Sequence, residues 1–202
     1  MAPSRRSRYR KLRLRFRKLS LQPRFRLFVV ALVALLVLLI FSYIYQLAEP
    51  RYYAVVGKPS ISAAFINQVL AWYGSPAAGK GQALYDDGVE YGIDPVYALA
   101  FFMHESRFGT TGVATVTRSL GNIRVSEGYA QYEGYRKYRR WEDGFEDWYK
   151  LIAKQYVAQW GLSTVDQIVP VYAPSSDNND VKAYIASVKQ AVDTWRSGSI
   201  EV

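Results

Sequence analysis

The pattern of apolar and polar positions divides this chain into two parts. Leu27–Ala48 holds 22 consecutive residues without a charge, and the run Leu27–Phe41 within it is apolar throughout. As a helix this stretch extends about 33 Å, and the hydrocarbon core of a bilayer is about 30 Å thick. From residue 60 onward apolar residues recur at helical spacing, as on helices with one buried face. The pattern predicts one transmembrane helix at 27–48 and one mostly helical domain at 60–198.

Capping residues and apolar periodicity give the boundaries of the elements in the domain. Asp94 and Pro95 are residue types favoured at the N-cap and the first helical position, and Asp180 precedes another periodic segment. The predicted helices run from Ser60 or Ser62 to Tyr73, from Ala83 to Tyr91 with an interruption at Gly88, from Pro95 to Gly109, from Trp141 to Val157, from a capping box at Ser163–Asp166 to just before Pro170, and from Asp180 to Gly198. Strand signals occur at Asn122–Val125 and Tyr135–Tyr138, which could pair as a small hairpin. The expected fold class is α+β, mostly helical, with a small β-hairpin lobe and one preceding transmembrane helix.

Charge is concentrated in front of the apolar stretch. Residues 1–26 carry eleven Lys or Arg and no Asp or Glu. Basic residues flank the cytoplasmic end of a membrane helix, so we expect a basic cytoplasmic arm at 1–26 and an extracytoplasmic domain. The net charge of +9 comes from the arm, because the rest of the chain contains 15 Lys or Arg and 17 acidic residues. We expect the arm to touch anionic lipids, with no nucleic-acid partner.

Two further features concern the connection to the membrane. A cleaved signal peptide is the competing interpretation of 27–48, but its apolar region is normally about 7–15 residues long and ends at a small-residue cleavage site. The sequence favours an uncleaved signal anchor. Residues 49–59 contain two prolines and predict a short tether that keeps the domain close to the membrane. The absence of cysteine excludes disulfides and thiol chemistry.

The candidate chemistry centres on Glu105, near the end of an otherwise apolar helix. Ala98, Phe101 and Phe102 share its helical stripe, so its carboxyl would emerge beside apolar surface and be poorly solvated. The negative end of the helix dipole disfavours the charged form as well. Both effects raise the pKa. A carboxyl that stays protonated near neutral pH can act as a general acid, as cleavage of a glycosidic bond requires.

Four segments in order resemble a known family: HESRFGT around Glu105, SLGNIR, YRKYRRWEDGFEDWYKLI and VYAPSSDNNDVKAYIASV. They are similar to the glucosaminidase-type peptidoglycan hydrolases of the lysozyme-like superfamily (glycoside hydrolase family 73-like), over roughly residues 60 to 197. The resemblance implies that Glu105 is the catalytic acid and that peptidoglycan glycan strands are the partner. It also suggests substrate-binding roles for Phe108, Asn122 and Tyr172, which lie in matching segments.

A second carboxylate would normally assist the acid as base or nucleophile. Glu127 is the first candidate and Glu133 the second, and a solvated hairpin charge is the plain alternative for both. The N-acetyl group of the substrate could replace such a carboxylate, so that Glu105 acts alone. Tyr129 belongs to a group of tyrosines around the hairpin whose rings could face sugars, or lie in the core.

Other chemistries have little support. His104 is the single histidine, and Phe108 stands where the second histidine of an H-E-x-x-H zinc site would be. No metal and no cofactor are expected. A Ser-His-Asp triad through His104 lacks a G-x-S-x-G elbow.

The predicted function is a membrane-anchored hydrolase of a β-1,4 glycosidic bond in the wall glycan, of endo-β-N-acetylglucosaminidase type. The alternatives are a non-catalytic glycan-binding or envelope-scaffold protein, and a lipid or nucleic-acid binder that works through its arm.

Overall fold

The structure is a computed structural model that describes residues 23–202 of the chain. Most of the basic arm predicted for residues 1–26 lies outside the described residues. The chain divides into two compact units, one up to Tyr45 and one from Gln46 to Val202, and each is described by itself.

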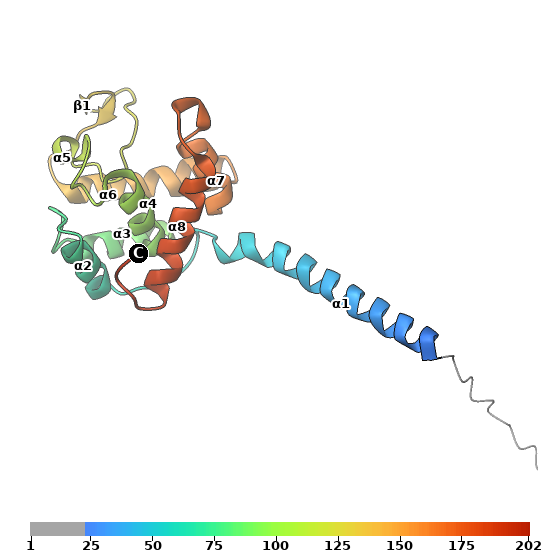
Figure 1. The fold of residues 1–202 in the computed structure, drawn as a ribbon. Coiled ribbons are helices and arrows are strands. Elements are labelled where there is room, and N and C mark those ends of the chain that lie inside the picture. The colour runs from blue at the N-terminus through green and yellow to red at the C-terminus, as the bar shows by residue number, and fades with distance from the viewer. Residues whose placement is uncertain (1–22) are drawn as a thin grey trace, which may run out of the picture. The chain divides into compact units, whose positions relative to one another are not determined.

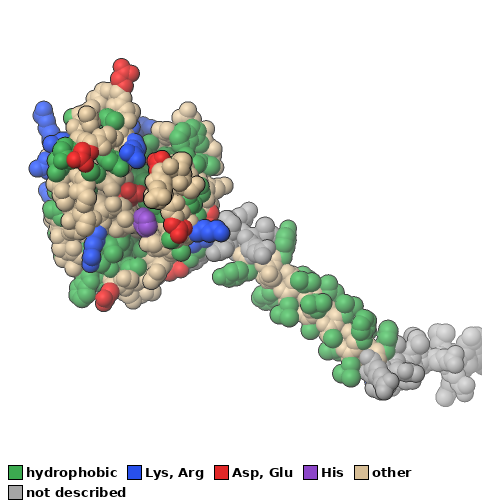
Figure 2. Space-filling model, turned by 45° about the horizontal axis from the view of Figure 1, so that its top comes forward, with side chains coloured by type: hydrophobic (Ala, Val, Ile, Leu, Met, Phe, Trp, Pro, Cys, Tyr) green, Lys and Arg blue, Asp and Glu red, His purple; other side chains and the backbone are tan. Residues whose placement is uncertain are grey.

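The first unit contains most of helix α1, Pro23–Tyr52. Every side chain from Phe25 to Tyr45 is exposed, and hydrophobic side chains follow the visible face of this helix (Figure 2). Within the described residues, Phe25–Tyr45 is the one helical stretch long and apolar enough to cross a membrane. Length and composition alone do not separate an anchor from a signal sequence at this position.

The second unit is built around helix α4, Pro95–Ser106 (Figure 1). Asp94 caps its first turn by accepting a hydrogen bond from the Val96 amide, as its position in the sequence predicts. All residues from Pro95 to Phe102 are buried. Helix α8, Val181–Arg196, lies along α4, and the contact between these two helices is the most extensive one in the domain. A helix enclosed on all sides can be apolar around its whole circumference, which explains the uninterrupted apolar sequence before Glu105.

Helices α2, Ala63–Trp72, and α3, Gly81–Tyr91, pack against each other, and α3 also packs on α6, Trp141–Lys150. Ser62 caps α2, one of the two predicted caps. The predicted interruption of α3 at Gly88 was wrong. A Cβ at Gly88 would lie 2.6 Å from Cγ of Pro95, so the glycine lets α3 approach the start of α4 without breaking the helix.

The long helix predicted at 141–157 is continuous but changes type. It runs as α6, Trp141–Lys150, and continues as the π-helical segment η1, Leu151–Gln159. The amide of Trp160 donates to the carbonyl of Gln155, five residues earlier. Its predicted buried face is confirmed, since Phe145, Trp148, Tyr149, Ile152 and Tyr156 are all buried. Periodicity did not reveal the π-helical segment, a type of geometry that often occurs at functional sites.

A small lobe follows α4 in the chain. It contains the short helix α5, Ala114–Thr117, and the antiparallel strands β1, Gln131–Tyr132, and β2, Tyr135–Arg136. The predicted pairing of 122–125 with 135–138 occurs as a single bridge between Arg124 and Tyr135, while β1 takes the longer pairing with β2. The mostly helical α+β fold with a small hairpin lobe is confirmed.

The last part of the chain closes the domain. Helix α7, Val165–Tyr172, starts one residue later than the predicted capping box at Ser163–Asp166: Thr164 is the N-cap, and its amide donates to the Gln167 side chain. The helix leads through the 3-10 turn η2, Ser175–Asp177, to α8. The helix does not end before Pro170 as predicted. It continues to Tyr172, and the Ala173 amide donates to the Val169 carbonyl beyond the proline.

Residues 53–57, which we expected in a free tether, belong to the domain. Tyr53 and Val55 are buried in the core, and the Val55 amide and carbonyl bond to Ser163 and Asp94. Bridges at Ala54 and at Val56 join the same segment to two other parts of the domain. The domain therefore begins before residue 60, and the chain between the apolar stretch and the domain is shorter than the predicted eleven residues.

Candidate active site

Glu105 lies in the last turn of α4, and the backbone behind it turns sharply. The helix ends at Ser106, three residues before Gly109, because Arg107 and Phe108 both take left-handed backbone conformations, with φ of 47° and 57°. The Ser106 hydroxyl holds this turn: it donates to the Leu120 carbonyl at 2.8 Å and accepts from the Gly109 amide. The end of α4 is thereby fixed to the segment that carries Asn122.

Two side chains hold the Glu105 carboxyl. The Tyr184 hydroxyl, from α8, donates to Oε1 at 2.6 Å. The Asn122 amide donates to Oε2 at 3.4 Å and to the Glu105 backbone carbonyl at 2.8 Å. One donor comes from α8 and the other from the loop before the hairpin lobe, so the carboxyl is oriented from two sides.

Burial raises the pKa of Glu105 from 4.5 to about 7. The hydrogen bonds from Tyr184 and Asn122 and the positive charge of Arg124 favour the carboxylate and partly offset this effect. The prediction of a raised pKa is confirmed, with loss of solvation as its main cause. A carboxyl with this pKa holds its proton in a large fraction of molecules at neutral pH and is still stabilised after losing it. This combination suits a general acid.

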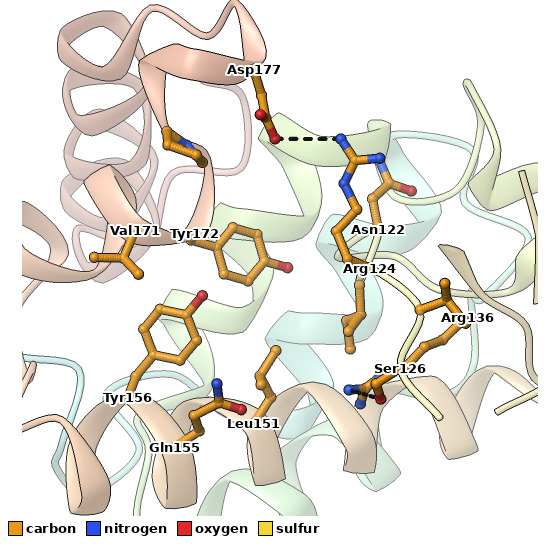
Figure 3. A pocket seen from close by; sticks show the side chains of 13 residues that line it. Asn122, Arg124, Ser126, Arg136, Leu151, Gln155, Tyr156, Val171, Tyr172 and Asp177 are labelled. Carbon is orange, nitrogen blue, oxygen red and sulfur yellow. Dashed lines mark hydrogen bonds and ion pairs between the residues drawn. The ribbon is translucent and has the colours of Figure 1, made fainter. Parts of the chain in front are cut away.

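The Glu105 carboxyl faces a pocket of about 150 Å³. A larger pocket of about 390 Å³ shares Asn122, Arg124, Tyr172 and Asp177 with it (Figure 3), so the two form one continuous groove. Residues of the π-helical segment, among them Tyr156, line the larger pocket and lie across from Arg124. The groove therefore extends from Glu105 along the seam between the hairpin lobe and the C-terminal helices.

Tyr172 lies where the two pockets meet. Its hydroxyl donates to the carbonyl of Gly121, and its ring packs edge-on against Phe101 at 5.3 Å. A Cβ at Gly121 would lie 2.5 Å from Cδ1 of Trp148 and 2.9 Å from the Tyr172 hydroxyl. This close approach, which only glycine allows, positions Tyr172 and the neighbouring Asn122 beside Glu105.

Phe108 and Tyr129 have other roles than the predicted ones. Phe108 is fully buried and packs against Tyr73 and Trp195, so it lines neither pocket of the groove. The Phe108 ring therefore packs in the core and holds the tight turn after α4. The Tyr129 hydroxyl donates to Asp147 at 3.0 Å, and the Arg136 guanidinium lies over its ring. Tyr129 therefore fastens the lobe to α6 and lines neither pocket that contains Asn122 and Tyr172.

The two candidate second carboxylates stay apart from Glu105 in this structure. Glu127 lies in an exposed turn after the Ile123–Val125 segment, and Glu133 lies at the exposed tip of the hairpin with a φ of 51°. Neither lines a pocket of the groove. The acidic residue that shares the small pocket with Glu105 is Asp177, from η2.

Tyr184, Arg124 and Asp177 belong to the site but are not among the residues predicted from the sequence. Tyr184 lies on the buried face of α8, so its apolar spacing indicates a core position and not a contact with the acid. Arg124 and Asp177 lie in two of the segments that resemble the family, but their sequence does not indicate that they meet. His104, the candidate for a triad, stacks on the Tyr184 ring with centroids 3.6 Å apart, and its Nδ1 lies 3.4 Å from the Ser187 hydroxyl. No aspartate contact of His104 occurs among the described residues.

An acid on a core helix, beside a groove between a helical body and a small hairpin lobe, defines a lysozyme-like glycoside hydrolase. The family model of Glucosaminidase, described as mannosyl-glycoprotein endo-beta-N-acetylglucosaminidase, matches residues 81–196. The chain belongs to this family.

Solved structures agree with the fold. Staphylococcus aureus autolysin E in complex with the muropeptide NAM-L-Ala-D-iGlu has a TM-score of 0.52 and 12% identity, over 74% of this chain and 73% of that one. A catalytic mutant of the same autolysin, with a glutamate replaced by alanine and the disaccharide NAG-NAM bound, gives a TM-score of 0.52 and 11% identity over the same shares. No curated protein matches the chain.

Proposed function

We propose that this chain is a membrane-anchored peptidoglycan hydrolase that cuts a β-1,4 bond of the wall glycan with Glu105 as general acid. The observation that carries the proposal is the Glu105 carboxyl, whose pKa is raised to about 7 by burial at the edge of a groove. Its protonated form donates to the leaving glycosidic oxygen. The hydroxyl of Tyr184 and the amide of Asn122 then stabilise the carboxylate that remains.

Peptidoglycan is the substrate class that the similar structures support. The two autolysin E structures hold a muropeptide and the disaccharide NAG-NAM, and both ligands are pieces of wall glycan. Cleavage after N-acetylglucosamine, the endo-β-N-acetylglucosaminidase type, follows the description of the family. The mutant autolysin is described as a catalytic mutant, and the residue replaced in it is a glutamate, as is Glu105.

Two routes differ in the group that assists Glu105. Substrate assistance by the N-acetyl group needs no further carboxylate, and the exposed positions of Glu127 and Glu133 favour it. The alternative brings Glu127 to the groove by movement of the lobe when glycan binds.

The proposed location is the cell membrane, with residues 27–48 as a signal anchor and the catalytic domain outside. The apolar stretch supports this, together with the eleven basic residues that precede it. The arm would also contact anionic lipids. The packing of residues 53–57 into the domain leaves a short connection, so the enzyme would act on glycan near the membrane.

The test is to incubate the full chain, purified in detergent, with wall sacculi and to identify the released fragments by mass spectrometry after borohydride reduction. We expect fragments with a reduced N-acetylglucosamine end. The folded Glu105→Gln variant is the control, and it should release none. A wild-type chain that binds sacculi without cutting them would contradict the proposal and favour a glycan-binding scaffold.

A further inference from the structure

An ion pair spans the groove beside Glu105. The Arg124 guanidinium, from the lobe, lies 3.5 Å from the Asp177 carboxylate, on the η2 turn between α7 and α8 (Figure 3). Both residues line the small pocket with Glu105 as well as the larger pocket. A glycan bound at Glu105 in this pocket therefore lies beside this pair.

The ion pair is exposed and weak, whereas contacts with the lobe position the Arg124 side chain. The two side chains are 66% and 46% exposed, and exposed ion pairs at such distances contribute little to stability. The Arg124 guanidinium also lies 4.7 Å from the centre of the Tyr135 ring, and its backbone forms a bridge with Tyr135. The guanidinium is thus directed toward the groove by the lobe, and its contact with Asp177 is easily exchanged for another anion.

The other arginine of the groove is already occupied. Arg136 donates to the Asp147 carboxylate at 2.7 Å and to the Ser126 hydroxyl at 2.8 Å, and its side chain is 12% exposed. Among the described residues, Arg124 is therefore the cation of the groove that is exposed and weakly paired.

The chemistry of the proposed substrate places a substituent that carries acidic groups next to the scissile bond. When N-acetylglucosamine is linked to O4 of N-acetylmuramic acid, the lactyl ether is on the adjacent O3. The oxygen that Glu105 would protonate is thus a direct neighbour of the substituent that carries the carboxylate or the stem peptide. Glu105 and Arg124 line one pocket of about 150 Å³, so both can be reached from one sugar unit.

We propose that Arg124 binds a carboxylate of the glycan substrate, and that Asp177 occupies its guanidinium until the substrate replaces it. The inference rests on the proposed function and identifies the substrate as a glycan with an acidic substituent beside the cleaved bond. A planar guanidinium matches a carboxylate with two parallel hydrogen bonds. The carboxylate is either the free lactyl group of a stripped glycan or an acid of the stem peptide.

The experiment compares one glycan in charged and neutral forms. The substrates are intact sacculi, amidase-stripped glycan with free lactyl groups, and the same two materials after their carboxylates are converted to carboxamides with carbodiimide and ammonia. The full chain is tested in detergent as wild type, Arg124→Gln, Arg124→Lys and Asp177→Asn. Arg118→Gln removes the same charge from an exposed side chain that lines neither pocket, and it is the matched control.

The readout is the ratio of kcat/KM on a charged glycan to kcat/KM on its amidated form. This ratio removes any effect of Arg124 on the Glu105 pKa, because that effect acts on both substrates. We expect Arg124→Gln to lower the ratio about 10-fold to 100-fold, the range for loss of hydrogen bonds to a charged group. Arg124→Lys should retain part of it, and Arg118→Gln all of it. The source of the carboxylate is identified by the substrate, intact sacculi or stripped glycan, for which the variant loses its preference for the charged form.

Asp177→Asn tests the exchange. It should raise kcat/KM on charged glycan through a lower KM, since the competing carboxylate is gone, and a kcat/KM that does not rise would contradict the exchange. An unchanged ratio in Arg124→Gln, or a loss of preference in Asp177→Asn, would overturn the inference. Absence of cleavage by the wild type on all four substrates would instead refute the proposed function, so the two failures are distinguishable.

Discussion

The hydroxyl of Tyr184 lies 2.6 Å from Oε1 of Glu105, although 79 residues separate them in the chain. The Tyr184 ring is buried between His104 and Phe101. A donor with so little freedom fixes one oxygen of the acid, while the Asn122 amide donates to the other at 3.4 Å. The hydrogen bond also stabilises the carboxylate and holds the pKa of Glu105 below the value that burial alone would give.

Replacing Tyr184 with Phe should therefore shift the pH profile of activity. Without this hydrogen bond the Glu105 pKa rises further, and the acid keeps its proton to higher pH. We expect the alkaline limb of kcat/KM to move upward by about one unit, the amount that a charge-assisted hydrogen bond supplies. The Phe ring keeps the stack with His104. An alkaline limb that stays in place would show that Tyr184 does not govern the ionisation of the acid.

Glu105→Gln should change stability in a pH-dependent way. The folded-state pKa of about 7 lies above the unfolded value of 4.5, so the folded protein binds the proton more tightly. Stability from this group is complete below pH 4.5 and is lost as the pH rises through 7, by on the order of 3 kcal/mol. The amide cannot ionise. Chemical unfolding of the variant and the wild type should agree near pH 4.5, and the variant should be more stable at pH 8.

Asp87 is a control for this experiment, because burial and neighbouring acids also raise its pKa to about 7. Asp87→Asn should produce the same trend while wall cleavage is retained. A Glu105→Gln variant that is less stable than the wild type at pH 8 would contradict the burial of an ionisable carboxyl at this position.

Glu127→Gln and Glu133→Gln distinguish the two catalytic routes. Both side chains are exposed and line neither pocket of the groove, so we expect each variant to keep its kcat on sacculi within about tenfold of the wild type. That result supports assistance by the substrate N-acetyl group. A decrease as deep as that of Glu105→Gln in either variant would instead identify the second catalytic carboxylate.

Gly121→Ala should damage both the fold and the site. The new methyl group would overlap the Trp148 ring and the Tyr172 hydroxyl, which are fixed by the core. Overpacking of this kind typically costs about 1–3 kcal/mol, and activity should fall because Tyr172 and Asn122 move. Gly57→Ala meets no atom within 4 Å and should change the melting temperature little. Equal melting temperatures for the two variants would contradict the close packing at Gly121.

The topology of the anchor is tested with protease on intact protoplasts. The charge bias before Leu27 predicts that the catalytic domain is digested while an epitope tag at the N-terminus is protected. Lysed protoplasts provide the control in which both are digested. Protection of the domain in sealed cells would place it in the cytoplasm and reverse the proposed orientation.

The sequence by itself determined the features that depend on neighbours along the chain. The caps at Ser62, Asp94 and Asp180 were predictable, since a cap is a hydrogen bond within a few residues. The raised pKa of Glu105 was predictable as well, because a mostly apolar helix places a carboxyl in its last turn beside apolar surface. The exposed apolar stretch Phe25–Tyr45 follows from composition alone.

Only the tertiary structure decided which distant side chains meet at the acid. Tyr184 and Phe108 both have aromatic rings at buried positions, yet one donates to Glu105 and the other packs in the core. The contact of Arg124 with Asp177 depends on how the lobe and η2 face each other across the groove. Periodicity specifies which face of a helix is buried but not which partner covers it, because that choice depends on how all the elements pack together.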